Sequence, residues 1–239
     1  MLEALRARRR PLYQLAVRAG FRGHEIQRIQ VAAREAGVPV ESLEAKAFER
    51  RAPKGANPQG VMLWVGALPD PFLEELVPEV GPCTLVALDG VEDPQNLGAI
   101  VRAADAAGAA GLVLTRRHSP PLSAAASRAS AGALEWLPVA RVPNLTRALN
   151  LLKKQDFWIY GADAEAPQDV FDLADRVLSA RRVVVLGAEG KGLREGVLAT
   201  LDHRVRIPMH GRITSLNVAA AAAVLLYELA RRAPGAGLE

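Results

Sequence analysis

Short apolar runs alternate with amphipathic stretches through most of this 239-residue chain. From residue 83 onward the runs are rich in branched residues and almost uninterrupted, which is typical of strands buried on both faces of a parallel sheet. Helical patterns lie between most of them, so the sequence predicts an α/β fold with a mostly parallel sheet flanked by helices. The predicted strands are residues 84–88, 111–115, 137–140, 157–161, 182–187 and 203–208.

The front of the chain carries a smaller pattern of its own. It reads as a strand, two helical stretches and a final apolar run, at residues 12–17, 24–36, 40–49 and 60–68. The next segment, DPFLEELVPEVGP, has three prolines and is typical of a linker. We therefore expect a small α/β domain over residues 1–70, a linker over 71–82 and a larger α/β domain over 83–239.

Positive charge is concentrated in the first quarter of the chain. Residues 1–55 hold twelve Lys or Arg against six Glu, whereas the remaining residues hold 18 basic and 20 acidic side chains. Basic charge gathered in one segment favours a partner with a phosphate backbone, because each neutralised phosphate releases a counterion. The alternative is a solvated basic surface with no such partner.

Several other classes of protein are excluded. Cys83 is the single cysteine, so neither an internal disulfide nor a thiolate metal cluster is expected, and the chain reads as cytoplasmic. The four histidines lack metal-ligand spacing, so we expect no metal site. The first fifteen residues lack the apolar run of a signal peptide, and the apolar stretch 216–226 is too short to span a bilayer. We expect no membrane role.

The segment LDGVEDPQNLGAIVRAADAAG, residues 88–108, carries the first candidate site residues. A strand ends at Leu88, Asn96 stands where a helix N-cap is expected, and Arg102 lies on the shoulder of the apolar stripe. Arg102 would then reach the carboxyl edge of the sheet, where ligands of open α/β folds bind. In the structural alternative, Asn96 only caps the helix and Arg102 pairs with Asp105.

A second segment, RVVVLGAEGKGL, runs from a buried strand directly into glycines. Glycines such as Gly187 and Gly190 let the backbone approach a ligand or adopt positive φ. Their spacing matches neither the dinucleotide fingerprint nor the P-loop. Glu189 would be a hydrogen-bond acceptor for a ligand or, alternatively, an exposed loop carboxylate.

A third segment, RIPMHGRITSLNVAAAAAVLLYELARR, leads from a strand through a loop into a long alanine-rich helix. Polar residues precede that helix. Thr214 or Ser215 as its N-cap is the structural interpretation, whereas a functional role for Ser215 and Asn217 requires a partner segment.

In this order the three segments resemble the signature motifs of the SpoU (TrmH) branch of the SPOUT methyltransferases. The resemblance covers residues 83–232 and includes the intervening SRASAGALEWLPVARVPNL. It implies a C-terminal α/β-knot domain with a deep trefoil knot and a homodimer formed through that domain. The most similar subgroup is the RlmB type, enzymes that methylate a guanosine 2′-hydroxyl of 23S rRNA. Their N-terminal domain, like ribosomal protein L30e, fits the basic first segment, although NPQGVML lacks the His that relatives often have before Gln-Gly.

The resemblance implies S-adenosylmethionine-dependent 2′-O-methylation of a ribose in structured RNA, with S-adenosylhomocysteine as the product and no metal. The expected partner is 23S rRNA or a ribosome assembly particle. The alternatives are a tRNA 2′-O-methyltransferase, an antibiotic-resistance rRNA methyltransferase and a non-catalytic RNA-binding relative. Catalysis is assigned by resemblance to Asn96, Arg102, Glu189, Ser215 and Asn217. Cofactor contacts are assigned to Leu186, Gly187, Gly190, Ile207, Met209, Ser215, Leu216 and Asn217.

The family proposal makes Arg102 the base, but a guanidinium keeps its proton at neutral pH. We therefore expect Arg102 to hold a substrate phosphate and to stabilise a developing alkoxide. Asn96 would orient Arg102 or the ribose, Ser215 and Asn217 would line the reacting centre, and Glu189 would hold this network in place.

Overall fold

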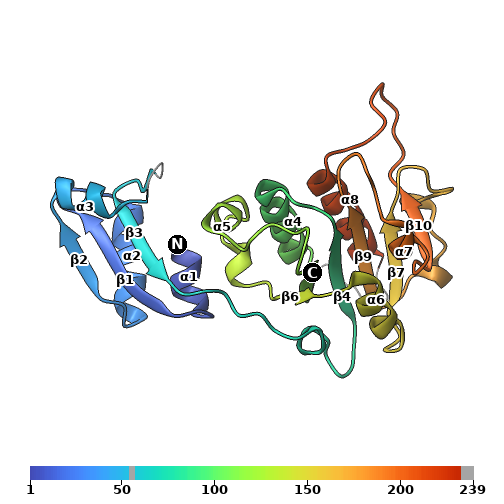
Figure 1. Ribbon diagram of the computed structural model, residues 1–239, viewed down its shortest axis with the longest axis horizontal. Helices are drawn as coiled ribbons and strands as arrows, with labels where there is room; N and C mark the ends of the chain where they lie inside the picture. The colour runs from blue at the N-terminus through green and yellow to red at the C-terminus, as the bar shows by residue number, and fades with distance from the viewer. Residues whose placement is uncertain (54–56, 233–239) are drawn as a thin grey trace. The chain divides into compact units, whose positions relative to one another are not determined.

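The computed structural model describes residues 1–53 and 57–232, which belong to two compact units, Met1–Pro69 and Asp70–Glu239. Figure 1 shows the first unit in blue to cyan and the second in green to red. The division into an L30e-like domain, a linker and a knotted domain stays a prediction. Among the described residues, no helix is both long enough and apolar enough to cross a membrane.

The first unit is a three-stranded sheet in the order β2-β1-β3, with helices on both faces. Strand β1 is parallel to β2 and antiparallel to β3. Its Leu15 and Val17 pack with side chains of α1 and α2, whereas Ala16 between them packs with Phe48 of α3. This alternation follows from the two-residue period of a strand. The elements are α1 (Leu2–Ala7), β1 (Leu12–Arg18), α2 (His24–Glu35), β2 (Val40–Leu43), α3 (Ala45–Arg51) and β3 (Val61–Val65).

Two local features of this unit differ from the sequence prediction. The helix expected at 40–49 is confirmed only from residue 45, where α3 begins; residues 40–43 form β2 instead and pair with β1, from Leu15↔Val40 onward. Helix α1 was not predicted at all. Its Leu5 is only 1% exposed and lies in the core beside α2. At 40–43 tertiary packing overrides local propensity, whereas α1 consists of good helix formers and is held in place by the burial of Leu5.

The second unit is a seven-stranded sheet whose order is β6-β5-β4-β9-β7-β10-β8. All of its pairings are parallel, which confirms the predicted architecture. Its strands are β4 (Cys83–Asp89), β5 (Gly111–Thr115), β6 (Val139–Val142), β7 (Trp158–Ala162), β8 (Gln168–Asp169), β9 (Arg181–Gly187) and β10 (His203–Arg206). Its α-helices are α4 (Pro94–Ala106), α5 (Ala124–Ala129), α6 (Leu145–Lys153), α7 (Glu195–Leu198) and α8 (Val218–Arg231). Its 3₁₀ helices are η1 (Leu73–Leu76), η2 (Ala133–Glu135), η3 (Val170–Asp172) and η4 (Asp175–Val177).

Helices cover both faces of this sheet (Figure 1). Leu85 and Ala87 of β4 pack in one core cluster with the buried leucines of α6. Val86 and Leu88 are also fully buried and alternate to the other face, where α4 and α8 pack. Leu73 and Leu76 of η1, in the segment expected to be a linker, pack in the α6 cluster.

The order of the strands reverses at the centre of the sheet. From β4 the chain continues to β5 and β6 on one side, while β9 pairs with β4 on the other, from Cys83↔Arg181 to Asp89↔Gly187. Ligands of open α/β sheets bind outside the carboxyl ends of the strands at such a reversal. A ligand site is therefore expected at the loops that follow Asp89 and Gly187.

Candidate functional site

The chain turns sharply after β9 and presents Glu189 near the tip of the turn. Ala188 and Gly192 exchange two backbone hydrogen bonds, of 3.2 and 2.9 Å. A Cβ on Gly187 would lie 2.3 Å from the carbonyl carbon of Gly192, and Gly190 has φ +74°, which favours glycine. The glycines of the sequence motif thus permit this turn.

Asn217 connects three segments that are far apart in the sequence. Its Nδ2 donates to Asn96 Oδ1 at 2.9 Å and to Glu189 Oε1 at 2.7 Å. Its Oδ1 accepts from the backbone N–H groups of Ala219 and Ala220 and so caps α8. One side chain therefore fixes the start of α8 to the first turn of α4 and to the turn after β9.

The N-cap predictions for both helices were wrong. Helix α4 is capped by Asp93, whose carboxylate accepts from the N–H of Gln95, and Pro94 occupies the first helical position. Asn96 lies within the first turn, half-buried, so its side chain is free to accept from Asn217. Helix α8 is capped by Asn217 rather than by Thr214 or Ser215.

Arg102 lies on α4, six residues after Asn96, and is exposed. Among the described residues its guanidinium has no hydrogen-bond or ion-pair partner, so the pairing with Asp105 that the structural alternative required is not observed. An unpaired, exposed guanidinium is available to a ligand phosphate.

The other predicted residues take no part in the hydrogen bonds between Asn96, Glu189 and Asn217. Leu186 and Gly187 end β9, and the half-buried Ile207 and Met209 follow β10. Leu216 is 36% exposed. Ser215 is also exposed, and within the described part of the chain its hydroxyl makes no hydrogen bond.

An ion pair beneath the turn was missed by the sequence reading. The side chain of Asp89 is completely buried at the end of β4, and its Oδ1 lies 2.6 Å from Arg194 Nε and 2.5 Å from an Arg194 terminal nitrogen. Its Oδ2 accepts from the Arg194 backbone N–H at 2.8 Å. The sequence did contain a signal for this pair, because Asp89 is an acidic residue at the end of a predicted buried strand, within the first motif.

Within residues 1–53 and 57–232, no group of three or more His, Cys, Asp or Glu side chains is arranged to hold a metal ion. The polar cluster of Asn96, Glu189 and Asn217 contains a single carboxylate and two amides, which suit hydrogen bonding to an organic ligand.

Two family models match the chain. The SpoU rRNA Methylase family model covers residues 84–227, and the model described as RNA 2′-O ribose methyltransferase substrate binding covers residues 1–71. The two matches correspond closely to the two compact units.

Curated relatives extend along most of the chain. A 23S rRNA (guanosine-2′-O-)-methyltransferase RlmB of Vibrio cholerae is 37% identical over 199 residues, which are 82% of this chain and 79% of the relative. A putative TrmH family tRNA/rRNA methyltransferase of Staphylococcus aureus is 34% identical over 227 residues, 93% of this chain and 89% of the relative.

A solved structure has the same fold. The SpoU methyltransferase AviRb of Streptomyces viridochromogenes, crystallised in complex with the cofactor AdoMet, superposes with a TM-score of 0.80 at 25% identity, over 96% of this chain and 86% of that chain. The motifs that meet at Asn217 all lie within the matched family region. The chain belongs to the SpoU rRNA methylase family.

Proposed function

We propose that this protein methylates the 2′-hydroxyl of a guanosine ribose in 23S rRNA, with S-adenosylmethionine as the methyl donor. It is an RNA 2′-O-methyltransferase of the SpoU family. The guanosine and the 23S rRNA are taken from the Vibrio cholerae relative. The substrate would be 23S rRNA or a ribosome assembly particle in the cytoplasm.

One observation carries the proposal. The amide of Asn217 is bonded to both Asn96 and Glu189, so that the three family motifs form a single polar cluster at the carboxyl edge of the sheet. That edge is where open α/β sheets bind ligands. A purely structural role for Asn217 would need only its cap of α8.

The residues around the turn fit S-adenosylmethionine. Leu216, Ile207 and Met209 offer apolar contacts for an adenine ring, and the Glu189 carboxylate complements a positive charge. Gly190 has open space where a side chain would be, so backbone groups of the turn are accessible. When bound, the cofactor supplies a methyl group that is activated by a positively charged sulfonium.

The polar residues then divide the remaining tasks. Arg102 binds a phosphate beside the target ribose and stabilises the negative charge that develops on the 2′-oxygen. Asn96 orients the ribose, and the two hydrogen bonds of the Asn217 amide fix the Asn96 and Glu189 side chains relative to each other. Ser215, exposed two residues before Asn217, lines the approach to the reacting centre.

The first unit would anchor the RNA. Residues 1–55 carry an excess of six positive charges, while the rest of the chain has two more acidic than basic side chains. The family model matched to residues 1–71 is a substrate-binding one. A basic unit in the same chain as a nearly neutral catalytic unit favours electrostatic capture of a phosphate backbone.

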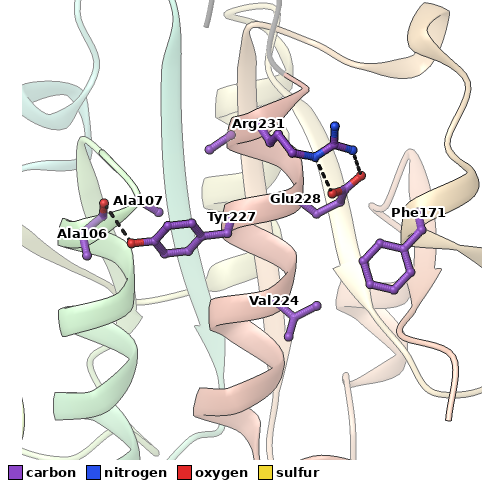
Figure 2. Close-up of a pocket in the computed structure, with 8 residues that line it drawn as sticks. Ala106, Ala107, Phe171, Val224, Tyr227, Glu228 and Arg231 are labelled. Carbon is purple, nitrogen blue, oxygen red and sulfur yellow. Dashed lines mark hydrogen bonds and ion pairs between the residues drawn. The ribbon is translucent and has the colours of Figure 1, made fainter. Parts of the chain in front are cut away.

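A homodimer and a knot belong to the same proposal. An apolar groove of about 360 Å³ lies between the end of α4, η3 and α8. Figure 2 shows Tyr227 and Phe171 in this groove, 54% and 46% exposed, next to the Glu228–Arg231 ion pair. Large exposed aromatic side chains with a charged rim are typical of an interface, here with a second copy.

The insertion of β9 between β4 and β7 is compatible with a threaded chain.

A methyl-transfer assay tests the reaction and the target together. Purified protein is incubated with methyl-labelled S-adenosylmethionine and either 23S rRNA, a ribosome assembly particle or tRNA. We expect label on a single guanosine 2′-oxygen of 23S rRNA, and none after Arg102→Ala, although calorimetry shows nearly unchanged cofactor affinity for that variant. Label on tRNA alone would transfer the proposal to tRNA, and no label on any RNA would refute it.

Oligomeric state is tested separately. Sedimentation equilibrium should give twice the mass of one chain for the unmodified protein, and the mass of one chain for Tyr227→Glu, which places a charge in the apolar groove. A monomer before substitution would refute the dimer.

A further inference from the structure

A second cavity opens beside the candidate active site and has no role in the proposal above. It measures about 320 Å³ and lies at the carboxyl ends of β5 and β6 and the start of α7. Its polar lining includes Thr115, Arg117, His118, Asn144, Thr146 and Arg194. Three of these six side chains are basic or protonatable, and no acidic side chain is in the lining.

Arg117 supplies the uncompensated charge of this cavity. It is exposed, and within residues 1–53 and 57–232 its guanidinium has no hydrogen-bond or ion-pair partner. Its backbone is fixed, since the buried Thr115 donates its hydroxyl to the Arg117 carbonyl and also bonds to the Ser119 hydroxyl. The next residue, His118, has φ +59°, a left-handed conformation that is uncommon outside glycine.

Arg194 forms another wall of the cavity and is held rigidly. Two contacts with the buried Asp89 carboxylate fix its guanidinium, and its backbone N–H donates to the same carboxylate, although the Arg194 side chain remains 57% exposed. A guanidinium that is oriented in advance loses little entropy when it binds a phosphate through its remaining N–H groups.

The loop that holds His118 and the loop that holds Arg194 both contact loops of the candidate active site. His118 Nδ1 lies 3.4 Å from Glu92 Oε1, in the loop that leads into α4 and Asn96. Arg194 is tied to Asp89 below the turn that carries Glu189. An RNA strand with its ribose at Asn96 would therefore bring a neighbouring backbone group to this cavity.

We infer that the cavity binds a phosphodiester of the substrate RNA, next to the nucleotide that is methylated, with Arg117 as its principal ligand and Arg194 as a second. The inference deepens the proposed function and rests on it. Arg102 would hold the phosphate at the reacting ribose, and Arg117 would fix the direction of the strand. This site would contact the RNA backbone and not the bases, because an arginine guanidinium binds phosphate oxygens whatever the RNA sequence.

The test compares Arg117→Ala with Arg176→Ala in the full-length chain. Arg176 is also exposed and without a partner among the described residues, but it precedes the amino end of β9, whereas Arg194 follows the carboxyl end. RNA affinity is measured by fluorescence anisotropy with a labelled 23S rRNA fragment over a range of salt. Cofactor affinity is measured by calorimetry, and methyl transfer is measured for the unmodified protein.

We expect Arg117→Ala to weaken RNA binding about tenfold. The slope of log Kd against log salt should fall by about 0.7 to 0.9, the contribution of one phosphate contact. Cofactor affinity should stay unchanged, and Arg176→Ala should resemble the unmodified protein. Equal RNA affinity and equal salt slope for Arg117→Ala and the unmodified protein would overturn the inference while methyl transfer still supports the proposed function.

Inorganic phosphate provides the second arm. If phosphate alone at millimolar concentration binds the unmodified protein but not Arg117→Ala, while RNA affinity is the same for both, the cavity holds a free phosphate and the inference is overturned. If phosphate competes with RNA only in the protein that retains Arg117, the inference is supported. If the unmodified protein methylates no RNA, that result refutes the proposed function and does not test the cavity.

Discussion

The side-chain amide of Asn217 lies 2.9 Å from Asn96 Oδ1, although 121 residues separate them in the sequence. The same amide reaches Glu189 at 2.7 Å, and the Asn217 carbonyl oxygen caps α8. A single residue thus combines a local structural role with a long-range one, and substitutions can separate the two.

Replacing Asn217 by Ser should preserve the helix cap and remove the bridge to Asn96 and Glu189. Serine is a good N-cap, so the thermal unfolding midpoint should change little, whereas Asn217→Ala should cost about 1 kcal/mol of stability. Both variants should lose methyl transfer by about ten- to a hundredfold, because a hydrogen bond to a charged group is lost. A serine variant with full activity would contradict the role of the bridge.

Gly187→Ala should abolish cofactor binding. The new Cβ would lie 2.3 to 2.6 Å from backbone atoms of Gly192 and Leu193, which cannot rotate away as a side chain can. The turn that carries Glu189 must therefore open. The matched control is Gly196→Ala, whose Cβ would meet nothing closer than Thr146 Oγ1 at 3.5 Å. Calorimetry with S-adenosylmethionine should detect binding to the control only.

Arg194→Ala should destabilise the second unit by about 3 kcal/mol, because it leaves the buried Asp89 carboxylate without its cation. Asp89→Asn should cost less, since the exposed Arg194 guanidinium is then solvated by water. Urea unfolding of both variants, with Arg176→Ala as the exposed-arginine control, measures the difference. If both variants lose the same free energy of unfolding, the unpaired Asp89 carboxylate is not the cause of the destabilisation.

His203 makes stability depend on pH. Its ring lies between Trp158 and Tyr160, with centroids 5.2 and 5.3 Å away. Burial lowers the pKa of the imidazole below its ordinary 6.5, and the nearby Asp202 opposes this more weakly. The unfolded chain therefore takes up the proton first as pH falls. The stability contributed by the neutral ring is complete above pH 6.5 and is lost as pH falls through 6.5 toward the folded pKa.

Unfolding measured between about pH 7.5 and about pH 5.5 checks this sign. His203→Gln removes the titrating group and should flatten the decline in stability toward acid pH. His210→Gln, at an exposed position without ring contacts among the described residues, should leave the decline as it is. An unchanged profile in His203→Gln would mean that another group causes the decline.

Removing residues 1–69 should spare cofactor binding and weaken RNA binding. These residues form a compact unit of their own and include the basic excess of the chain. The remaining unit should bind S-adenosylmethionine as before, and its RNA affinity should depend less on salt because fewer phosphates are neutralised. Equal salt slopes for the truncated and full-length proteins would refute the anchoring role.

Much of the second unit follows from sequence alone. Nearly continuous apolar runs such as 182–187 can only be buried on both faces, and this requirement predicts parallel strands and covering helices. The glycines at 187 and 190 mark the turn, since a close approach and a positive φ leave few other choices. The family motifs supply the identities of Asn96, Glu189 and Asn217.

Helix ends and long-range pairs are beyond such reasoning. Asp93 and Asn96 are both good N-cap residues, and in the structure the helix starts directly after Asp93, with Pro94 at its first position. Asp89 and Arg194 are 105 residues apart, so their pairing depends on the placement of β9 beside β4. Tertiary contacts likewise turned 40–43 into a strand.

The place of β9 in the sheet also bears on how the protein is made. Strand β4 leaves the ribosome about a hundred residues before its partner β9, and Asn217 follows later still. During that interval one side of β4 has no strand beside it, and loops of this length close slowly. The cluster of Asn96, Glu189 and Asn217 therefore assembles among the last events of synthesis, when the final helix packs onto the sheet. We expect a chain truncated before that helix to lack methyl transfer, however well its earlier parts had folded.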